Sequence, residues 1–256
     1  MVFLLTEGRK LVGYELILRN IPGALKTISS IPEKHRLNIE YIETCTRSKE
    51  IYWLFMAIDF TDVEEEVTPE LILEEFRNAK VYVLDASIAP SKFNIVYPSR
   101  LCIKNIGGMR AILLGLGNMR GLINGIKDNM GEEMGNSFLY HLGYGVGKEL
   151  YNLYAKPFNV DNLEDGVTIL TALARGGGWA DVYIEDIGKK EVILKVEGLW
   201  ECDISRGKGD NKPKSNYVRG ILAGFFEHLI RKKVIVKEVT CIGLGDPYCR
   251  FNISMI

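Results

Sequence analysis

The stretch KEVTCIGLGDPYCRFNISMI, residues 237–256, carries the most informative pattern in the chain. Glu238 is followed three positions later by Cys241, and Cys249 follows eight positions after that. Two apolar runs flank a segment of glycine, aspartate and proline, which predicts a β-hairpin. The hairpin would bring two sulfurs and one carboxylate to one end of a sheet. These groups are three ligands of a Zn²⁺-type site, which needs one further donor.

This spacing places a condition on the first strand of the hairpin. Side chains alternate between the two faces of a strand, so Glu238 and Cys241 reach one ion only if the strand ends or bulges near Thr240. Alternatively, the cysteines are small buried apolar residues, and Glu238 pairs with Arg250 across the hairpin. The residues by themselves leave both interpretations open. A bound metal would be structural, because no His-rich open catalytic site is visible.

Size and composition indicate an ordinary globular protein. The chain has 256 residues and a net charge of −1, so no electrostatic bias favours nucleic acid or anionic membrane. The apolar run at residues 2–5 is too short for a signal peptide, and no stretch reaches the ~18 apolar residues of a membrane helix. Five cysteines at wide, unequal spacing predict reduced thiols in a cytoplasmic protein, some of them metal-bound, rather than a disulfide framework.

Residues 1–90 predict a ferredoxin-like domain, a βαββαβ sandwich with both helices on one face of an antiparallel sheet. The expected strands are 11–19, 37–45, 51–60 and 81–88, and the expected helices begin at Pro22 and near Thr68, a candidate N-cap. The segment 89–108 contains two prolines and ends in Gly107-Gly108, which favours a domain boundary there.

The turn NIPGAL, Asn20 to Leu25, resembles the ACT regulatory domain, whose signature here is typically Asp-x-Pro-Gly-x-Leu. Asn20 departs from that signature. The resemblance covers about the first ninety residues and implies side-by-side pairing into a homodimer. It also implies a small ligand near Gly23, where a ligand can approach the backbone and a helix N-terminus offers free N–H groups. The alternative is that Pro22 and Gly23 only begin a helix.

Residues 105–256 predict a second α+β domain, an antiparallel sheet with helices packed on it. Helices are expected at 119–131, at 134–154, up to about Ala174 and at 215–233, with Ser215 a candidate N-cap; strands are expected from Trp179, at 190–200 and in the closing hairpin, and 110–116 is expected to be a buried strand or helix start. The glycines at 143, 145, 147, 220 and 224 predict close approach of two helices, because they do not follow a strand as a phosphate-binding motif does.

The succession MRAILLGL, FLYHLGYGVGKEL, ARGGGWADV, GILAGFFEHL and EVTCIGLGDPYCRFNI resembles the 4-vinyl reductase domain family over about residues 105–256. The ending is the specific part of the match. Similar domains occur in sensor modules of phenol-responsive transcription activators and, more distantly, in vesicle-tethering subunits. The resemblance therefore implies a small-molecule-binding module, and the family name does not by itself imply reductase activity.

The resemblance also implies a ligand set. In the phenol-sensing members the metal ligands are a Glu, a Cys three positions on and a Cys eight further, which fall on Glu238, Cys241 and Cys249. Their fourth ligand is a Cys whose position here is Ser215, a departure. Cys202, in GLWECD, is the expected substitute if its loop folds back, with Ser215 or water as the alternatives.

Together these features predict a cytoplasmic, regulatory, small-molecule-binding protein with a zinc-stabilised hairpin. An apolar pocket for a small apolar or aromatic molecule would be lined by Phe138, Trp179, Tyr183 and Trp200. The basic run 206–214 is expected to be a solvated loop or a lid. No catalytic signature or dinucleotide fingerprint occurs, so we do not expect the isolated chain to be an enzyme. Alternatives are a reductase or enzyme subunit acting on a vinyl-bearing or tetrapyrrole-like substrate, and an assembly subunit with a protein partner.

Overall fold

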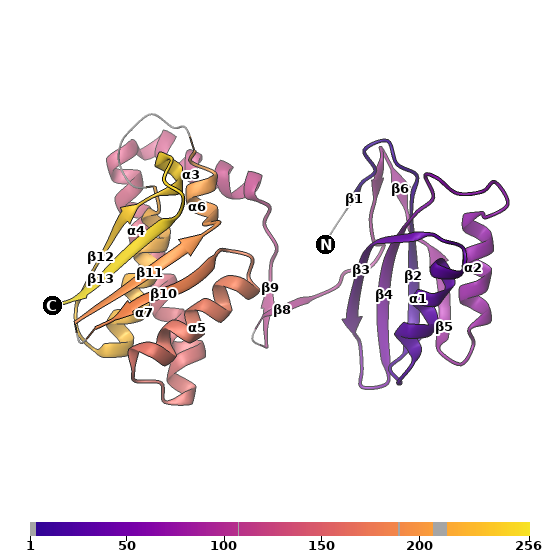
Figure 1. Cartoon of the computed structure of the whole chain (residues 1–256), viewed down its shortest axis with the longest axis horizontal. Coiled ribbons are helices and arrows are strands. Elements are labelled where there is room, and N and C mark those ends of the chain that lie inside the picture. Colours follow the sequence, from indigo (N-terminus) through magenta and orange to yellow (C-terminus); the bar gives the residue numbers. More distant parts are fainter. Residues whose placement is uncertain (1–3, 107, 189, 207–213) are drawn as a thin grey trace. The chain divides into compact units, whose positions relative to one another are not determined.

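The chain folds as two compact units in a computed structural model that describes residues 4–106, 108–188, 190–206 and 214–256 (Figure 1). Unit 1 comprises Met1–Asn105 with Met109–Leu113, and unit 2 comprises Ile106–Gly108 with Leu114–Ile256. The start of the chain, Gly107 of the expected boundary and most of the basic run 206–214 lie outside the described residues.

Unit 1 is built on a four-stranded sheet and two helices. Along the chain these are β2 (Leu11–Arg19), α1 (Ala24–Lys34), β3 (Asn38–Thr46), β4 (Ile51–Asp59), α2 (Pro69–Asn78) and β5 (Val83–Ile88). The strand order is β3-β4-β2-β5, with every neighbouring pair antiparallel. Thr68 caps α2, since its side chain accepts a hydrogen bond from Leu71 N, as predicted. The likeness of unit 1 to ACT domains stays a prediction.

Both faces of this sheet are buried, which explains the continuous apolar run of β4. Leu54 and Met56 pack with α1 and α2 on one face, whereas Trp53 and Phe55 belong to a second core on the other face. A small antiparallel sheet of β1 (Leu4–Leu5), β7 (Ile95–Val96) and β6 (Ser91–Lys92) contributes to that second core. Unit 1 therefore extends past residue 90.

A disulfide joins Cys45 on β3 to Cys102, with the two Cα atoms 5.7 Å apart. The prediction that all five cysteines are reduced thiols is wrong for this pair, and the argument from cysteine usage for a cytoplasmic location no longer holds. The sequence hid the pairing because the two residues are 57 positions apart. Cys202, Cys241 and Cys249 are free and buried.

Unit 2 contains a second antiparallel sheet, in the order β10-β11-β13-β12, and a stack of helices. Its elements, with the β8–β9 hairpin that leads into it, are β8 (Lys104–Ile106), β9 (Met109–Ala111), α3 (Leu116–Met130), α4 (Glu132–Leu150), the π-helical turn η1 (Tyr151–Ala155), the 3-10 turn η2 (Lys156–Phe158), α5 (Leu163–Gly176), β10 (Asp181–Ile187), β11 (Glu191–Glu197), α6 (Trp200–Asp203), α7 (Asn216–Ile230), β12 (Val234–Thr240), the 3-10 turn η3 (Ile242–Leu244) and β13 (Cys249–Met255).

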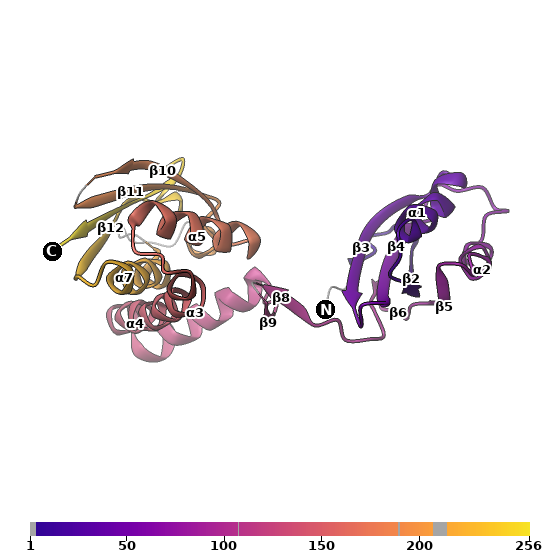
Figure 2. The same cartoon turned by 90° about the horizontal axis from the view of Figure 1, so that it is seen from below.

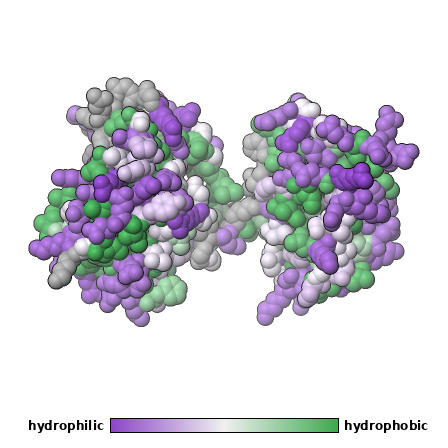
Figure 3. All heavy atoms as spheres, viewed as in Figure 1, coloured by the Kyte–Doolittle hydropathy of each residue, from purple (hydrophilic) through white to green (hydrophobic). Residues whose placement is uncertain are grey.

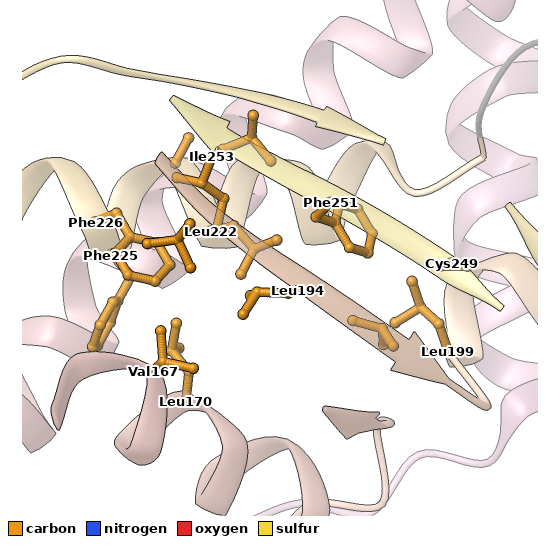
Figure 4. Close-up of a cluster of buried hydrophobic side chains, with 14 of the residues drawn as sticks. Val167, Leu170, Leu194, Leu199, Leu222, Phe225, Phe226, Cys249, Phe251 and Ile253 are labelled. Carbon is orange, nitrogen blue, oxygen red and sulfur yellow. The ribbon is translucent and has the colours of Figure 1, made fainter. Parts of the chain in front are cut away.

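The helices of unit 2 lie in layers on one face of the sheet (Figure 2). Helices α5 and α7 lie against the strands, α4 packs on α7, and α3 packs on α4. Phe225 and Phe226 of α7 meet Leu194, Phe251 and Ile253 of the sheet in the core (Figure 4). The outward face of the sheet mixes hydrophilic and hydrophobic side chains (Figure 3), as the alternating burial along β11 and β12 requires.

Residues 112–114 do not form the buried element that the sequence predicted. Ile112 is 81% exposed, and Leu113 and Leu114 are also exposed. None of the helices in the described ranges is both long enough and apolar enough to cross a membrane.

Glycines allow the backbones of α4 and α7 to touch. The glycines in contact are Gly143, Gly147, Gly220 and Gly224. A Cβ atom at Gly143 would lie 2.0 Å from the carbonyl oxygen of Tyr217, which no side chain tolerates. The predicted close approach is confirmed for these four. It is wrong for Gly145, which faces open space.

Candidate metal centre

Four side chains that can ligate a metal converge at one end of the C-terminal sheet. Cys202 comes from α6, Glu238 from β12, Cys241 from the residue after β12, and Cys249 from the first residue of β13. Their ligand atoms all lie within 4.8 Å of one another, and all four residues are buried. The structure thus brings together the four residues that the sequence predicted as ligands.

An irregularity in the hairpin directs Glu238 and Cys241 to the same point. Glu238 pairs with Phe251 and Thr240 pairs with Arg250, so the register shifts between Glu238 and Thr240. Strand β12 ends at Thr240. The extra residue in the first strand changes which face the following side chain takes. The predicted interruption near Thr240 is confirmed.

Backbone groups of the turn bind the cluster from outside. Cys241 N donates a 2.7 Å hydrogen bond to Asp246 Oδ2, and Ile242 N donates a 3.4 Å bond to Cys249 Sγ. Contacts of this kind fix the direction in which a ligand points. The turn residues between the two cysteines therefore hold the sulfurs in place as well as reversing the chain.

Glu238 presents its two oxygens to different partners. Oε1 lies 3.3 Å from Cys202 Sγ, and that sulfur lies 3.5 Å from Cys241 Sγ. Oε2 accepts hydrogen bonds from Ser215 N at 3.2 Å and Ser215 Oγ at 2.6 Å. Ser215 is therefore a neighbour of the carboxylate, and Cys202 supplies the fourth donor.

The alternative pairing of Glu238 with Arg250 is wrong. Arg250 Nε lies 2.7 Å from Glu185 Oε2, an ion pair between β13 and β10. Glu238 faces the opposite side of the sheet and is buried.

The electrostatics of the cluster fit a cation. Hydrogen bonds with the thiols of Cys202 and Cys249 lower the pKa of Cys241 to about 2, whereas the contact with Cys241 raises the pKa of Cys202. Burial raises the pKa of Glu238, and the Ser215 hydroxyl opposes that shift. Sharing protons in this way limits the buried negative charge. A bound cation would do so better, because it stabilises every ligand in its ionised form. Three sulfurs and one carboxylate, all buried, suit a closed four-coordinate Zn²⁺ site.

The comparisons with known proteins place this hairpin in a family. The family model for the vinyl-4-reductase domain matches residues 201–255, a span that contains all four candidate ligands. The chain ends in a vinyl-4-reductase domain. The resemblance to the 4-vinyl reductase family is thereby confirmed for the ending, the part on which it most depended.

A solved structure shows that the likeness of fold extends beyond the span of the family match. The phenol-responsive sensory domain of the transcription activator PoxR, with phenol, has a TM-score of 0.53 and 22% identity, covering 58% of this chain and 78% of that one. This comparison shows a shared fold.

Curated relatives match about half of the chain. The uncharacterized protein MJ0745 of Methanocaldococcus jannaschii is 26% identical over 122 residues, covering 46% of this chain and 56% of the relative. MJ0150 of the same organism is 25% identical over 119 residues, covering 46% and 64%. The chain therefore spans less than two thirds of the length of either relative.

Glu201, at the start of the family match, is a site residue that the sequence analysis missed. It is 1% exposed, and its carboxylate accepts 2.8 Å hydrogen bonds from the backbone N–H groups of Tyr217 and Val218 in the first turn of α7. Burial raises its pKa to about 8. Glu201 thus caps α7 from another element, whereas Ser215, the predicted N-cap, makes no side-chain capping bond. A cap from a distant segment leaves no local sequence signal.

The aromatic residues predicted to line a pocket separate into two groups. Trp179 and Trp200 meet edge to face at 6.4 Å, and Trp200 also contacts Tyr217 at 6.0 Å. Phe138 and Tyr183 are 41% and 40% exposed, and neither takes part in these ring contacts. Trp200 opens α6, the helix that carries Cys202. A ligand at any of these residues stays a prediction.

Gly23, the remaining candidate, lies in unit 1. It adopts a left-handed backbone conformation with φ of 90° before α1 and lines a surface cavity of about 360 Å³. Lys26, Thr44 and Thr46 also line this cavity, so it offers a positive charge and hydroxyl groups. Ligand binding beside Gly23 likewise stays a prediction.

Proposed function

We propose that this protein is a small-molecule-binding regulatory protein whose vinyl-4-reductase domain is held together by one structural Zn²⁺ ion. The observation that carries the proposal is the buried cluster of Cys202, Glu238, Cys241 and Cys249. Zinc with four protein ligands keeps no open position for a substrate, so its contribution is to the fold.

Zinc would fix three segments that are distant in sequence. Cys202 belongs to α6, Glu238 and Cys241 to the end of β12, and Cys249 to β13. Ligands from all three would connect the short helix to the closing hairpin. When bound, the ion supplies a positive charge that compensates thiolates and a carboxylate in a buried place.

The proposed ligand site lies where α6 connects the metal cluster to the paired tryptophans. Trp200 packs against Trp179 and Tyr217 and stands two residues before Cys202. Apolar and aromatic side chains of this kind recognise small aromatic molecules. The shared fold with a phenol sensory domain supports this class of ligand. Binding would alter α6, and α6 would pass the change to α7 through the Glu201 cap.

Unit 1 would supply the regulatory connection by forming a homodimer and by binding a small polar ligand in the cavity beside Gly23. The charge of Lys26 and the hydroxyls of Thr44 and Thr46 favour a carboxylate in that cavity. A protein partner would receive the output.

Native mass spectrometry of the purified chain, combined with elemental analysis, tests the metal. We expect one zinc per chain and a mass that returns to the apo value when the protein is denatured. A native protein that is fully folded without metal would contradict the proposal.

Fluorescence titration with phenol and its alkyl derivatives tests the ligand site. We expect saturable quenching that Trp200→Phe removes, and that the control Trp53→Phe, in the core of unit 1, leaves intact. Equal quenching in both variants would place the ligand elsewhere.

A further inference from the structure

The segment after β7, residues 97–102, is fastened to unit 1 by a buried carboxylate. Glu15 on β2 is 5% exposed and accepts hydrogen bonds from the Ser99 backbone N–H and, at 2.6 Å, from Ser99 Oγ. Arg100 Nε lies 3.9 Å from Glu15 Oε2, and Arg100 also approaches Asp85 at 4.0 Å. These contacts hold the segment against the sheet face that lies opposite α1 and α2.

The Cys45–Cys102 disulfide is the covalent end of the same attachment. Cys45 is near the end of the edge strand β3, and Cys102 is the last residue before the chain leaves for the β8–β9 hairpin and α3. Cys102 is 6% exposed and belongs to the core on that side of the sheet. Beyond Cys102 the chain is the only covalent connection to unit 2.

The main core of unit 1 does not depend on this segment. The core between the sheet and the two helices contains Tyr14, Leu16, Leu54, Ile72 and Phe76, and no described residue beyond Ala86 contributes a buried side chain to it. The segment is therefore attached to a sheet that has its own helix-covered core. Releasing the attachment need not unfold that core.

We propose that the Cys45–Cys102 disulfide is a redox-controlled latch that sets the length of free chain between the two units. A dithiol reductant attacks the S–S bond, passes through a mixed disulfide and leaves as its own cyclic disulfide. Two electrons and two protons thereby reach Cys45 and Cys102, which become thiols. The Glu15 contacts then remain as the polar attachment, and the segment opens locally.

The consequence is a change in tether length. Residues 97–102 add at most ~20 Å of reach when they leave the sheet. Unit 2 can then occupy a wider range of positions around unit 1, while both folds are retained. The latch does not depend on a metal or on a ligand, so it can fail or hold independently of the proposed function.

Counting thiols gives the first test. In denaturant, air-oxidised protein should show the three free thiols of Cys202, Cys241 and Cys249, and protein treated with a phosphine reductant should show all five cysteines. Five thiols before reduction would overturn the proposal.

Hydrogen exchange of the full chain gives the second test. On reduction, amides in residues 97–102 should exchange faster by about tenfold or more, whereas β2 and β4 should not change. Cys102→Ala should show the fast rate under both conditions, and Cys45→Ala should repeat the result from the other end of the bond. Unchanged exchange on reduction would overturn the latch. An equal increase in β4 would also overturn it, because the disulfide would then hold the whole unit together.

Discussion

Ser215 Oγ donates a 2.6 Å hydrogen bond to Glu238 Oε2, and this bond joins the start of α7 to the end of β12. Ser215 is 0% exposed and Glu238 is 7% exposed, so the contact is shielded from water. It leaves Glu238 Oε1 directed at the sulfur of Cys202. A serine beside the helix therefore orients the carboxylate of the candidate metal centre.

Replacing Ser215 should weaken metal binding without abolishing it. Ser215→Ala removes the hydroxyl bond and leaves the backbone N–H bond to the same oxygen. Loss of such an outer contact lowers metal affinity by about tenfold to a hundredfold. Ser254→Ala is the control, because Ser254 donates only a 3.4 Å bond to Glu191 at the other end of β13. Competition with a zinc chelator measures both, and equal affinity in the two variants would contradict the role of Ser215.

Removing two of the sulfurs should release the metal. Cys241→Ala with Cys249→Ala leaves Glu238 buried without a cation, which should lower the free energy of unfolding by ~3–5 kcal/mol. Acid should release zinc from the unaltered protein, because thiolates must be deprotonated to bind it. Cys45→Ala with Cys102→Ala removes the same number of cysteines from unit 1 and should retain the zinc. Elemental analysis and thermal unfolding give the result, and zinc retained in the first double variant would refute the site.

Two glycines on α4 should respond oppositely to the same substitution. Gly143→Ala places a Cβ 2.0 Å from the backbone oxygen of Tyr217 and should destabilise the fold by ~3 kcal/mol or more. Gly145→Ala meets open space and should stabilise the helix by ~0.5–1 kcal/mol. Urea unfolding of both variants measures the contrast. Similar destabilisation by both would mean that α4 and α7 do not pack as described.

The contact between Tyr144 and Glu227 should make stability depend on pH in the alkaline range. Tyr144 Oη donates a 2.7 Å bond to Glu227 Oε2, and this bond raises the pKa of Tyr144 to about 12. Between the unfolded pKa of ~10 and that value, the unfolded chain releases the phenol proton first, so stability falls as pH rises. Tyr144→Phe should cost ~1 kcal/mol at neutral pH and show a smaller fall above pH ~10. Urea titrations across this range test it, and an unchanged slope would exclude Tyr144 as the cause.

Local patterns in the sequence predicted much of the fold and part of the site. The strand expected at 11–19 is β2, and the helix expected after Thr68 is α2. Glu238, Cys241 and Cys249 were found because they lie within one hairpin, where spacing alone fixes which side chains meet. The same reasoning required the irregularity near Thr240 that the structure contains.

Only the tertiary structure decided which distant segments meet these elements. Cys202 joins the cluster, Glu201 caps α7, and Cys102 reaches Cys45 because helices and connecting segments fold back onto the two sheets. Residues 112–114, apolar in sequence, are exposed because no described segment packs over them. Alternation and spacing act over a few residues along the chain. Contacts between distant segments depend on packing, which leaves no periodic signal in the sequence.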